Sequence, residues 1–359
     1  MGPDRRLIER FGIDLPIIQA PMAGVSSPEM AAEAARAGAL GSIGAGAGDA
    51  DSARAMIRSV RQKFDGPLNV NLFCHRPATA RPEVETAWIA RFRQEFAAYS
   101  AEPPQGLREI YQSFVVDDAM LAMLLDERPK VVSFHFGLPP DGAIRALKEA
   151  GIVLLASATS LDEAQKLVGA GIDAVVAQGW EAGGHRGVFD PDAPDDRLGV
   201  VALTRQLVQA LDCPVIAAGG LMDGAGIAAA VALGASAAQL GTAFIACDES
   251  LADGGYRAAL VGQAARHTVM TRAISGRPAR CLANRFTARG ADILPAEVPD
   301  YPIAYDLGKA LNAAAKSQGE SGFGAQWAGQ GAPLSRPMPT ARMVETLARE
   351  FEAARGAVT

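Results

Sequence analysis

The feature that most constrains the fold is a regular alternation of short apolar runs with alanine-rich segments of helical period. Eight of these runs are rich in β-forming residues, and they cover 17–22, 39–44, 68–73, 131–136, 152–157, 173–178, 214–220 and 237–244. Such alternation is typical of a parallel sheet covered by helices. An open doubly wound sheet gives a similar local pattern, but eight strands with helices between them in about 250 residues favour a (β/α)₈ barrel. We therefore predict an α/β fold of the TIM-barrel type.

The segments between the runs carry helix signals. PEMAAEAARAG at 28–38 has Ser27 in position to cap its start and Gly38 just beyond its end. LDEAQKLVGAG at 161–171 and MDGAGIAAAVALGA at 222–235 repeat this plan. Each is expected to form one of the outer helices.

Two stretches interrupt the alternation. Residues 75–116 separate the third and fourth runs, and residues 248–324 follow the eighth, whereas loops in such folds usually take about 2–6 residues. We expect them to form a smaller, mainly helical cap or substrate domain, with WIARFRQEF at 88–96 in its core. The predicted division is 1–75, 117–250 and 325–359 for the barrel, and 76–116 and 251–324 for the cap. A cap at one barrel end would shield a site from water.

Composition excludes several classes of function. The net charge is −6 and no basic stripe is present, so we expect no nucleic-acid partner. No segment approaches the roughly 20 apolar residues that span a bilayer, and the start lacks a signal-peptide pattern. The 4 cysteines form no CxxC pair, so neither a metal site nor a disulfide framework is expected. These features predict a cytoplasmic protein, with poorly ordered ends at 2–6 and after 353.

In a barrel of this kind the active site lies at the C-terminal ends of the strands. QGWEAGGHRG at 178–187 follows the sixth run and carries His185, a side chain that can move protons near neutral pH. His135 ends the fourth run, where it is either a functional or a satisfied core histidine. Glycine loops after the seventh and eighth runs are typical of a phosphate cradle, which predicts a phosphorylated cofactor.

Other reactive side chains have ordinary interpretations. His75 and His267 carry no functional signal, and adjacent Cys74 and His75 would point to opposite faces of a strand. Tyr301, Tyr305 and Lys309 are four residues apart and are predicted to share one helix face. By spacing alone that face is a solvated surface.

Seven segments occur in order along the chain: PIIQAPMAG, LGSIGAG, LNVNLFCHRP, QGWEAGGHRG, PVIAAGGLMDG, AAQLGTAF and WAGQGAP. Together they resemble the nitronate monooxygenases (2-nitropropane dioxygenases) of the bacterial class I type. The resemblance implies noncovalent FMN on a TIM barrel. It also implies oxidation of an alkyl nitronate, with propionate 3-nitronate as the expected substrate. Molecular oxygen and a flavin semiquinone would take the reaction to an aldehyde or oxoacid plus nitrite, without NAD(P)H.

The resemblance also implies roles for individual residues. The flavin ring and ribityl contacts fall on Ala20, Met22, Asn71, Gln178 and Gly183. The phosphate contacts fall on Gly219, Gly220, Gln239, Gly241 and Thr242, and Gly329 and Gln330 return to the flavin from the C-terminal side. His185 takes the place of the catalytic histidine and His135 that of a second active-site histidine. Tyr301, Tyr305 and Lys309 take the substrate side, where a cation and two phenols would suit an anion.

Two alternatives remain open at this point. The first is an FMN-dependent enoyl-acyl-carrier-protein reductase or NAD(P)H:quinone reductase, because such enzymes share the PMAG, GGH and AAGG elements. The second is a noncatalytic flavin-binding or storage protein. A reductase requires a nicotinamide donor, and a storage protein turns over neither donor.

Overall fold

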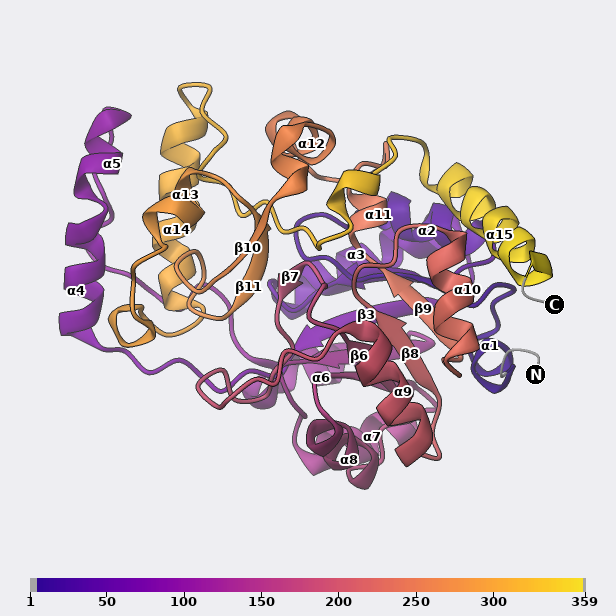
Figure 1. Cartoon of the computed structure of the whole chain (residues 1–359). Coiled ribbons are helices and arrows are strands. Elements are labelled where there is room, and N and C mark those ends of the chain that lie inside the picture. The colour runs from indigo at the N-terminus through magenta and orange to yellow at the C-terminus, as the bar shows by residue number, and fades with distance from the viewer. Residues whose placement is uncertain (1–4, 358–359) are drawn as a thin grey trace.

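The computed structural model describes residues 5–357, and its centre is a sheet of eight parallel strands that nearly closes into a barrel (Figure 1). The strands are β1 (Ile17–Gln19), β2 (Gly41–Gly44), β3 (Leu68–Phe73), β4 (Val131–His135), β5 (Val153–Ala158), β6 (Ala174–Gln178), β8 (Val215–Ala218) and β9 (Ala237–Leu240). They pair in the order β1-β9-β8-β6-β5-β4-β3-β2. Leu40 joins the two ends, since its N–H donates to the carbonyl of Ile17 and its carbonyl accepts from the N–H of Gln19, at 2.9 and 3.0 Å. The predicted (β/α)₈ barrel is confirmed.

The strands form where the sequence is apolar on both faces. All six residues of β5 and all five of β6 are buried. Parallel strands covered on both sides read as continuous apolar runs, which explains why their positions could be predicted. The eighth run is the exception, because pairing stops at Leu240 and residues Thr242–Ile245 turn into a short helix, α11.

Helices cover the outside of the barrel. They are α2 (Pro28–Arg36), α3 (Ala50–Lys63), α6 (Asp118–Glu127), α7 (Asp141–Glu149), α8 (Leu161–Gly169), α9 (Val200–Ala210) and α10 (Gly224–Ala232). The predicted ends of α2 are confirmed: Ser27 accepts a hydrogen bond from the N–H of Met30, and Gly38 has a φ of 93°. None of the described helices combines the length and hydropathy needed to cross a bilayer.

Two further helices lie near the ends of the chain. α1 (Arg6–Phe11) precedes β1, and α15 (Thr340–Ala357) packs against α10 and α2 (Figure 1). Met343, Val344 and Leu347 of α15 are buried in one cluster with Ile227 of α10 and Met30 of α2. Helix α15 extends to Ala357, but its buried residues end at Phe351, so poor order after 353 stays a prediction. Residues 1–4 and 358–359 lie outside the described part of the chain.

The two interrupting stretches lie together at one end of the barrel (Figure 1). Their helices are α4 (Pro82–Arg91), α5 (Arg93–Ala98), α12 (Gly254–Val261), α13 (Arg285–Arg289) and α14 (Ile303–Lys316), with short 3₁₀ turns η1 (Phe114–Val116), η2 (Gln263–Arg266) and η3 (Pro295–Glu297), and η4 (Ala332–Leu334) beyond them. The sequence did not predict a small antiparallel sheet in the order β10-β11-β7, formed by β10 (Thr268–Thr271), β11 (Ala279–Leu282) and β7 (Gly184–His185). Strand β7 comes from the loop after β6, so this sheet joins the barrel to the cap.

The cap has its own hydrophobic cluster. Trp88, Phe92 and Phe96 are at most 1% exposed and pack with residues of 273–323, as the helical period of WIARFRQEF predicted. We keep the division into 1–75, 117–250 and 325–359 against 76–116 and 251–324 as a proposal. The separate cluster supports it.

A buried carboxylate connects α3 to α6. The side chain of Glu127 is 6% exposed and accepts hydrogen bonds at 2.8 Å from each of Arg54, Arg58 and Arg61. Charge-assisted hydrogen bonds of this kind are stronger than neutral ones. The three arginines lie on successive turns of α3, so one side chain of α6 contacts three turns of that helix.

We predict that Glu127→Gln lowers the free energy of unfolding by about 1.5–3 kcal/mol, because the charged acceptor of three hydrogen bonds is lost. Urea denaturation would measure the change. Glu352→Gln is the matched control, since Glu352 is 66% exposed and pairs only with Arg355 in the described chain. The control should change stability by less than about 1 kcal/mol. Equal effects of the two changes would contradict the assignment.

Candidate active site

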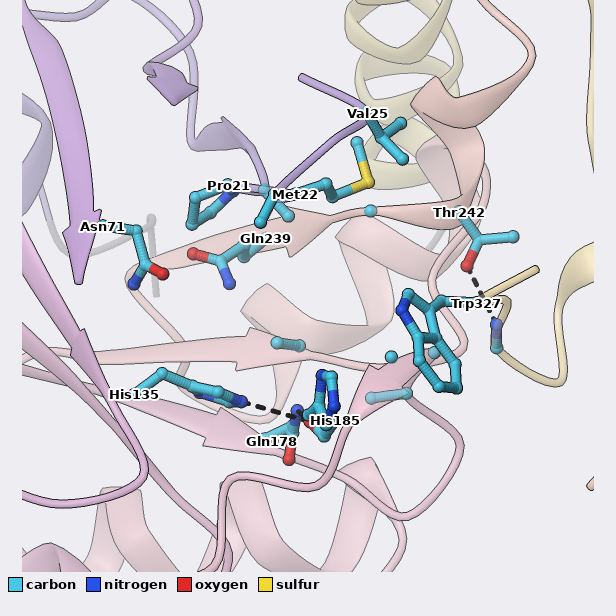
Figure 2. Close-up of a pocket in the computed structure, with 18 of the residues that line it drawn as sticks. Pro21, Met22, Val25, Asn71, His135, Gln178, His185, Gln239, Thr242 and Trp327 are labelled. Carbon is cyan, nitrogen blue, oxygen red and sulfur yellow. Dashed lines mark hydrogen bonds between the residues drawn. The ribbon is translucent and has the colours of Figure 1, made fainter. Parts of the chain in front are cut away.

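A cavity of about 420 Å³ lies at the C-terminal ends of the barrel strands, on the side that the cap covers. Figure 2 shows side chains from β3, β4, β6, β7 and β9, and from the segment that follows β1, facing this space. All but one of the residues predicted for the site line it, and these are Ala20, Met22, Asn71, His135, Gln178, Gly183, His185, Gly219, Gly220, Gln239, Gly241, Thr242, Tyr301, Tyr305, Lys309 and Gly329. Its size falls in the range of about 300–1,000 Å³ that is usual for small-molecule sites.

Gln330 is the residue that the structure does not bring to the cavity. Its neighbours Gly329 and Gly331 line the wall, but Gln330 is exposed and its N–H donates to the carbonyl of Glu181 at 2.9 Å. This backbone bond fixes the loop while the side chain faces away from the cavity. A contact of the Gln330 side chain with a cofactor therefore stays a prediction without support from its position.

The cavity is lined by Tyr301, Tyr305 and Lys309, as predicted, but the three residues do not lie on one helix. Helix α14 begins at Ile303, so Tyr301 precedes it and only Tyr305 and Lys309 share a helix face. The predicted common helix face of all three is wrong, because Tyr301 comes directly before Pro302 and a residue before proline disfavours the helical conformation. The ammonium of Lys309 lies 5.1 Å from the ring centre of Tyr305.

His135 holds the backbone of the histidine loop. Its Nε2 lies 3.1 Å from the carbonyl oxygen of His185, and its Nδ1 lies 3.0 Å from Oγ of Ser157. A carbonyl oxygen can only accept, so Nε2 carries the proton and Nδ1 of the neutral ring accepts from the serine hydroxyl. Burial lowers the pKa of His135 to about 4, which keeps the ring neutral. Both ring nitrogens are thus engaged, which supports a positioning role.

Gln178 fixes the same loop from the end of β6. Its Nε2 donates to the carbonyl of His185 at 3.0 Å, and its Oε1 accepts from the N–H of Gly187 at 2.7 Å. Figure 2 shows Gln178 and His135 on the same side of His185. Two side chains from the barrel therefore set where the loop backbone runs.

His185 itself lies in β7, where it pairs with Ala279 of β11. Its Nε2 is 2.8 Å from Oγ of Ser275, and its ring centre is 5.2 Å from that of Tyr301 and 5.0 Å from that of Trp327. Ser275 also approaches the carbonyl of Arg277, at 3.4 Å, and a hydroxyl that donates there accepts from the imidazole. In that arrangement Nδ1 of His185 is the free basic nitrogen.

The electrostatic setting keeps His185 unprotonated. Burial lowers its pKa well below the usual value, and the positive charge on Arg277 acts in the same direction. A neutral imidazole can accept a proton, whereas an imidazolium cannot. The imidazole of His185 is therefore available to accept a proton at neutral pH, and a role as general base stays a prediction.

The glycine loops after β8 and β9 form another part of the cavity wall. Gly219 and Gly220 have φ values of 119° and 71°, and neither N–H donates a hydrogen bond to any described residue. These are left-handed conformations that favour glycine, and they leave two amides free at the cavity. Thr242, at the start of α11, accepts a hydrogen bond from the N–H of Gly329 at 3.0 Å and so joins this wall to the WAGQGAP segment (Figure 2).

Sequence reasoning missed several residues of the site. Ser275 and Tyr111 contact the predicted residues or line the cavity, but they lie far from those residues along the chain and no local motif marks them. Ser157 could have been predicted, since it ends the fifth predicted run, and its Oγ lies 3.0 Å from Nδ1 of His135. Trp327 could also have been predicted from the sequence, since it begins the WAGQGAP segment.

Comparison with known proteins places the chain in a family. The sequence model of the family described as nitronate monooxygenase matches residues 4–350. A nitronate monooxygenase of Paraburkholderia phytofirmans is 61% identical over 97% of this chain and 95% of its own length. One of Pseudomonas aeruginosa is 52% identical over 96% and 99%. Among solved structures, a nitroalkane oxidase from Streptomyces ansochromogenes superposes with a TM-score of 0.89 at 42% identity, over 97% of this chain and 98% of that one. The chain therefore belongs to the nitronate monooxygenase family.

Proposed function

We propose that this enzyme oxidises alkyl nitronates, with propionate 3-nitronate as the substrate, by means of FMN and molecular oxygen. The products would be an aldehyde or oxoacid and nitrite, and no NAD(P)H would be consumed. One observation carries the proposal: a neutral imidazole, a lysine ammonium, two tyrosines and free glycine amides line one cavity. That arrangement suits an anionic substrate between a base and a phosphorylated cofactor. We also propose that the enzyme works in the cytoplasm.

The family is flavin-dependent, and the residues present fit FMN. The free N–H groups of Gly219 and Gly220, with Gly241 and Thr242 beside them, would hold a phosphate. Asn71, Gln178 and Met22 would lie along the ring system. When bound, the flavin supplies the redox chemistry, accepting electrons from the carbanion-like substrate.

The side chains of the cap would bind and orient the substrate. The ammonium of Lys309 lies over the rings of Tyr111 and Tyr305, at 5.5 and 5.1 Å, and would attract the anion. Burial raises the pKa of Tyr305 to about 12, so its phenol stays protonated and can donate to a nitro or carboxylate oxygen. His185 would remove the α-proton of a neutral nitroalkane, whereas with a preformed nitronate it would only bind and orient.

Oxygen uptake by the purified protein on propionate 3-nitronate, without added NADH, tests the proposal. We expect uptake with nitrite release, and anaerobic nitronate should convert the flavin spectrum to that of a one-electron-reduced form. Rapid loss of the flavin absorbance on anaerobic addition of NADH would instead indicate the reductase alternative. Bound FMN that reacts with neither donor would indicate a storage protein.

The close approach of Gly183 to the WAGQGAP segment gives a prediction about cofactor binding. A Cβ at Gly183 would lie 2.4 Å from the nitrogen of Gly329 and 2.5 Å from the carbonyl carbon of Ala328. We predict that Gly183→Ala weakens FMN binding about tenfold or more, because the two segments must separate. Quenching of FMN fluorescence on titration into cofactor-free protein would measure this.

The matched control is Gly142→Ala in α7, where no atom beyond the chain neighbours and the helix's own backbone lies within 4 Å of the added methyl group. It should leave the Kd for FMN unchanged. An unchanged Kd in Gly183→Ala as well would show that this wall does not contact the cofactor.

A further inference from the structure

A second cavity, of about 500 Å³, lies on the other side of Tyr301 from the active site. Tyr301 lines both cavities, and its ring separates His185 on one side from His75 on the other, at centre distances of 5.2 and 4.9 Å. The walls come from the segment after β3 and from the loops at 191–192, 272–277 and 295–300. No function is assigned to this space by the catalytic proposal above.

The wall of the second cavity carries a net positive charge. Its lining includes four arginines and two aspartates. Arg76 and Arg81 lie 3.5 and 3.2 Å from carboxylate oxygens of Asp300, and Arg272 lies 2.7 Å from Asp192. Three of the four arginines are therefore paired at the rim.

Arg277 is the arginine that has no carboxylate partner in the described chain. It is 3% exposed, its Nη2 donates to the carbonyl of Val188, and its Nε has no hydrogen-bond partner. The guanidinium carbon lies 4.4 Å from the ring centre of Phe136. Burial lowers the pKa of Arg277 to about 10, so the group is still charged at neutral pH. Asp190 and Asp192 act on this charge only from beyond ion-pair distance. A buried charge without a direct counter-ion is costly, so a ligand that supplies one would be stabilised here.

His75 adds a second unsatisfied group to the same wall. It is 1% exposed, and neither of its ring nitrogens has a hydrogen-bond partner in the described chain. Buried polar groups are nearly always partnered, so His75 and Arg277 form a wall whose polar groups the described chain does not satisfy. The sequence alone gives His75 no functional signal, because nothing near it along the chain marks the cavity.

We propose that the second cavity binds a short-chain monocarboxylate, with the guanidinium of Arg277 as its counter-ion. A planar carboxylate matches the planar donor fork of arginine. The carboxylates of Asp192 and Asp300 at the rim disfavour a doubly charged anion such as phosphate. Pro295, Val298 and Pro299 supply apolar wall for a short alkyl chain.

Fluorine NMR titration of the FMN-loaded enzyme with 3,3,3-trifluoropropionate tests this site. We expect Arg277→Met to raise the Kd of the probe about 10- to 100-fold, because the charged hydrogen bonds are lost. Lys309→Met removes the cation of the active site and serves as the matched control, with Arg76→Ala as a control for the rim. Both should change the Kd less than about threefold, since Arg76 is exposed and already paired. Inorganic sulfate, a dianion, should bind more weakly than the probe.

Equal affinity in wild type and Arg277→Met would overturn the proposal. Loss of binding in Lys309→Met alone would do the same, because the probe would then occupy the active site. If Arg277→Met does not fold, Arg277→Lys replaces it, with an expected fall in affinity of about tenfold because the fork is lost; equal affinity there would also count against the site.

Thermal unfolding separates a binding role of Arg277 from a structural one. Without probe, Arg277→Met should have the same Tm as wild type or a higher one, because an unpaired buried charge is removed. The probe should raise the Tm of wild type but not that of the variant, since only a folded state that binds is stabilised. A lower Tm in the variant, with an equal shift by the probe, would make Arg277 structural and refute the proposal.

Discussion

Replacing His185 by Asn is expected to lower kcat/KM for a neutral nitroalkane by about 10²- to 10⁴-fold, the usual contribution of a general base. The same change should lower kcat/KM for the corresponding nitronate by less than about tenfold, because that substrate has already lost its α-proton. Nitroethane and ethylnitronate, assayed in one buffer by oxygen uptake, would give the two values. The contrast between them identifies the base, since loss of binding alone would affect both.

The pH dependence of kcat/KM for the neutral nitroalkane tests the same assignment of His185 as the base. A base must be unprotonated to act, and burial lowers the pKa of His185 well below its usual value. The wild-type kcat/KM for nitroethane should therefore hold through pH 6.5 and fall only as pH approaches the lowered pKa. His267→Asn, which changes an exposed histidine, is the control and should match wild type. If His185→Asn harms both substrates equally at equal FMN content, the base is another group.

The sequence was sufficient to predict the barrel because its signals are local. Each strand is an apolar run that packs on both faces, and α2 is marked at both ends by Ser27 and Gly38. The small sheet was not predicted, since β10 and β11 are short and β10 is only partly buried. Their pairing with β7 depends on the cap folding back onto the barrel.

The site was predictable where residues directly follow barrel strands. His185 and Gly219 belong to this class, because the C-terminal ends of parallel strands converge. Ser275 could not be found in this way, since it lies 90 residues from His185 and reaches it only through the β7–β11 pairing. Arg277 was missed for the same reason, and its unpaired charge becomes visible only when burial is known.

Acid is expected to destabilise the folded chain steeply between about pH 6.5 and pH 4, because three buried histidines resist protonation. Burial lowers the pKa of His75 to about 3 and that of His135 to about 4, and it lowers the pKa of His185 in the same direction. In the unfolded chain each imidazole takes a proton near pH 6.5, while the folded chain does not. Their stabilising contribution is therefore complete above pH 6.5 and is lost as pH falls toward the folded pKa. Each histidine should remove roughly 1.4 kcal/mol of unfolding free energy per pH unit in this window.

Urea unfolding at several pH values between 4.5 and 7 would measure that slope, and His75→Phe isolates one contribution to it. Both ring nitrogens of His75 lack partners, so a ring of similar shape should leave stability at pH 7 unchanged or raise it. The variant should take up about one proton fewer on unfolding, so the slope of unfolding free energy against pH should decrease by roughly 1.4 kcal/mol per pH unit. His267→Asn, at an exposed position, should keep the wild-type slope. A His75→Phe protein with the wild-type slope would mean that His75 is protonated in the folded state, and the cavity beside it would then already hold its own positive charge without a ligand.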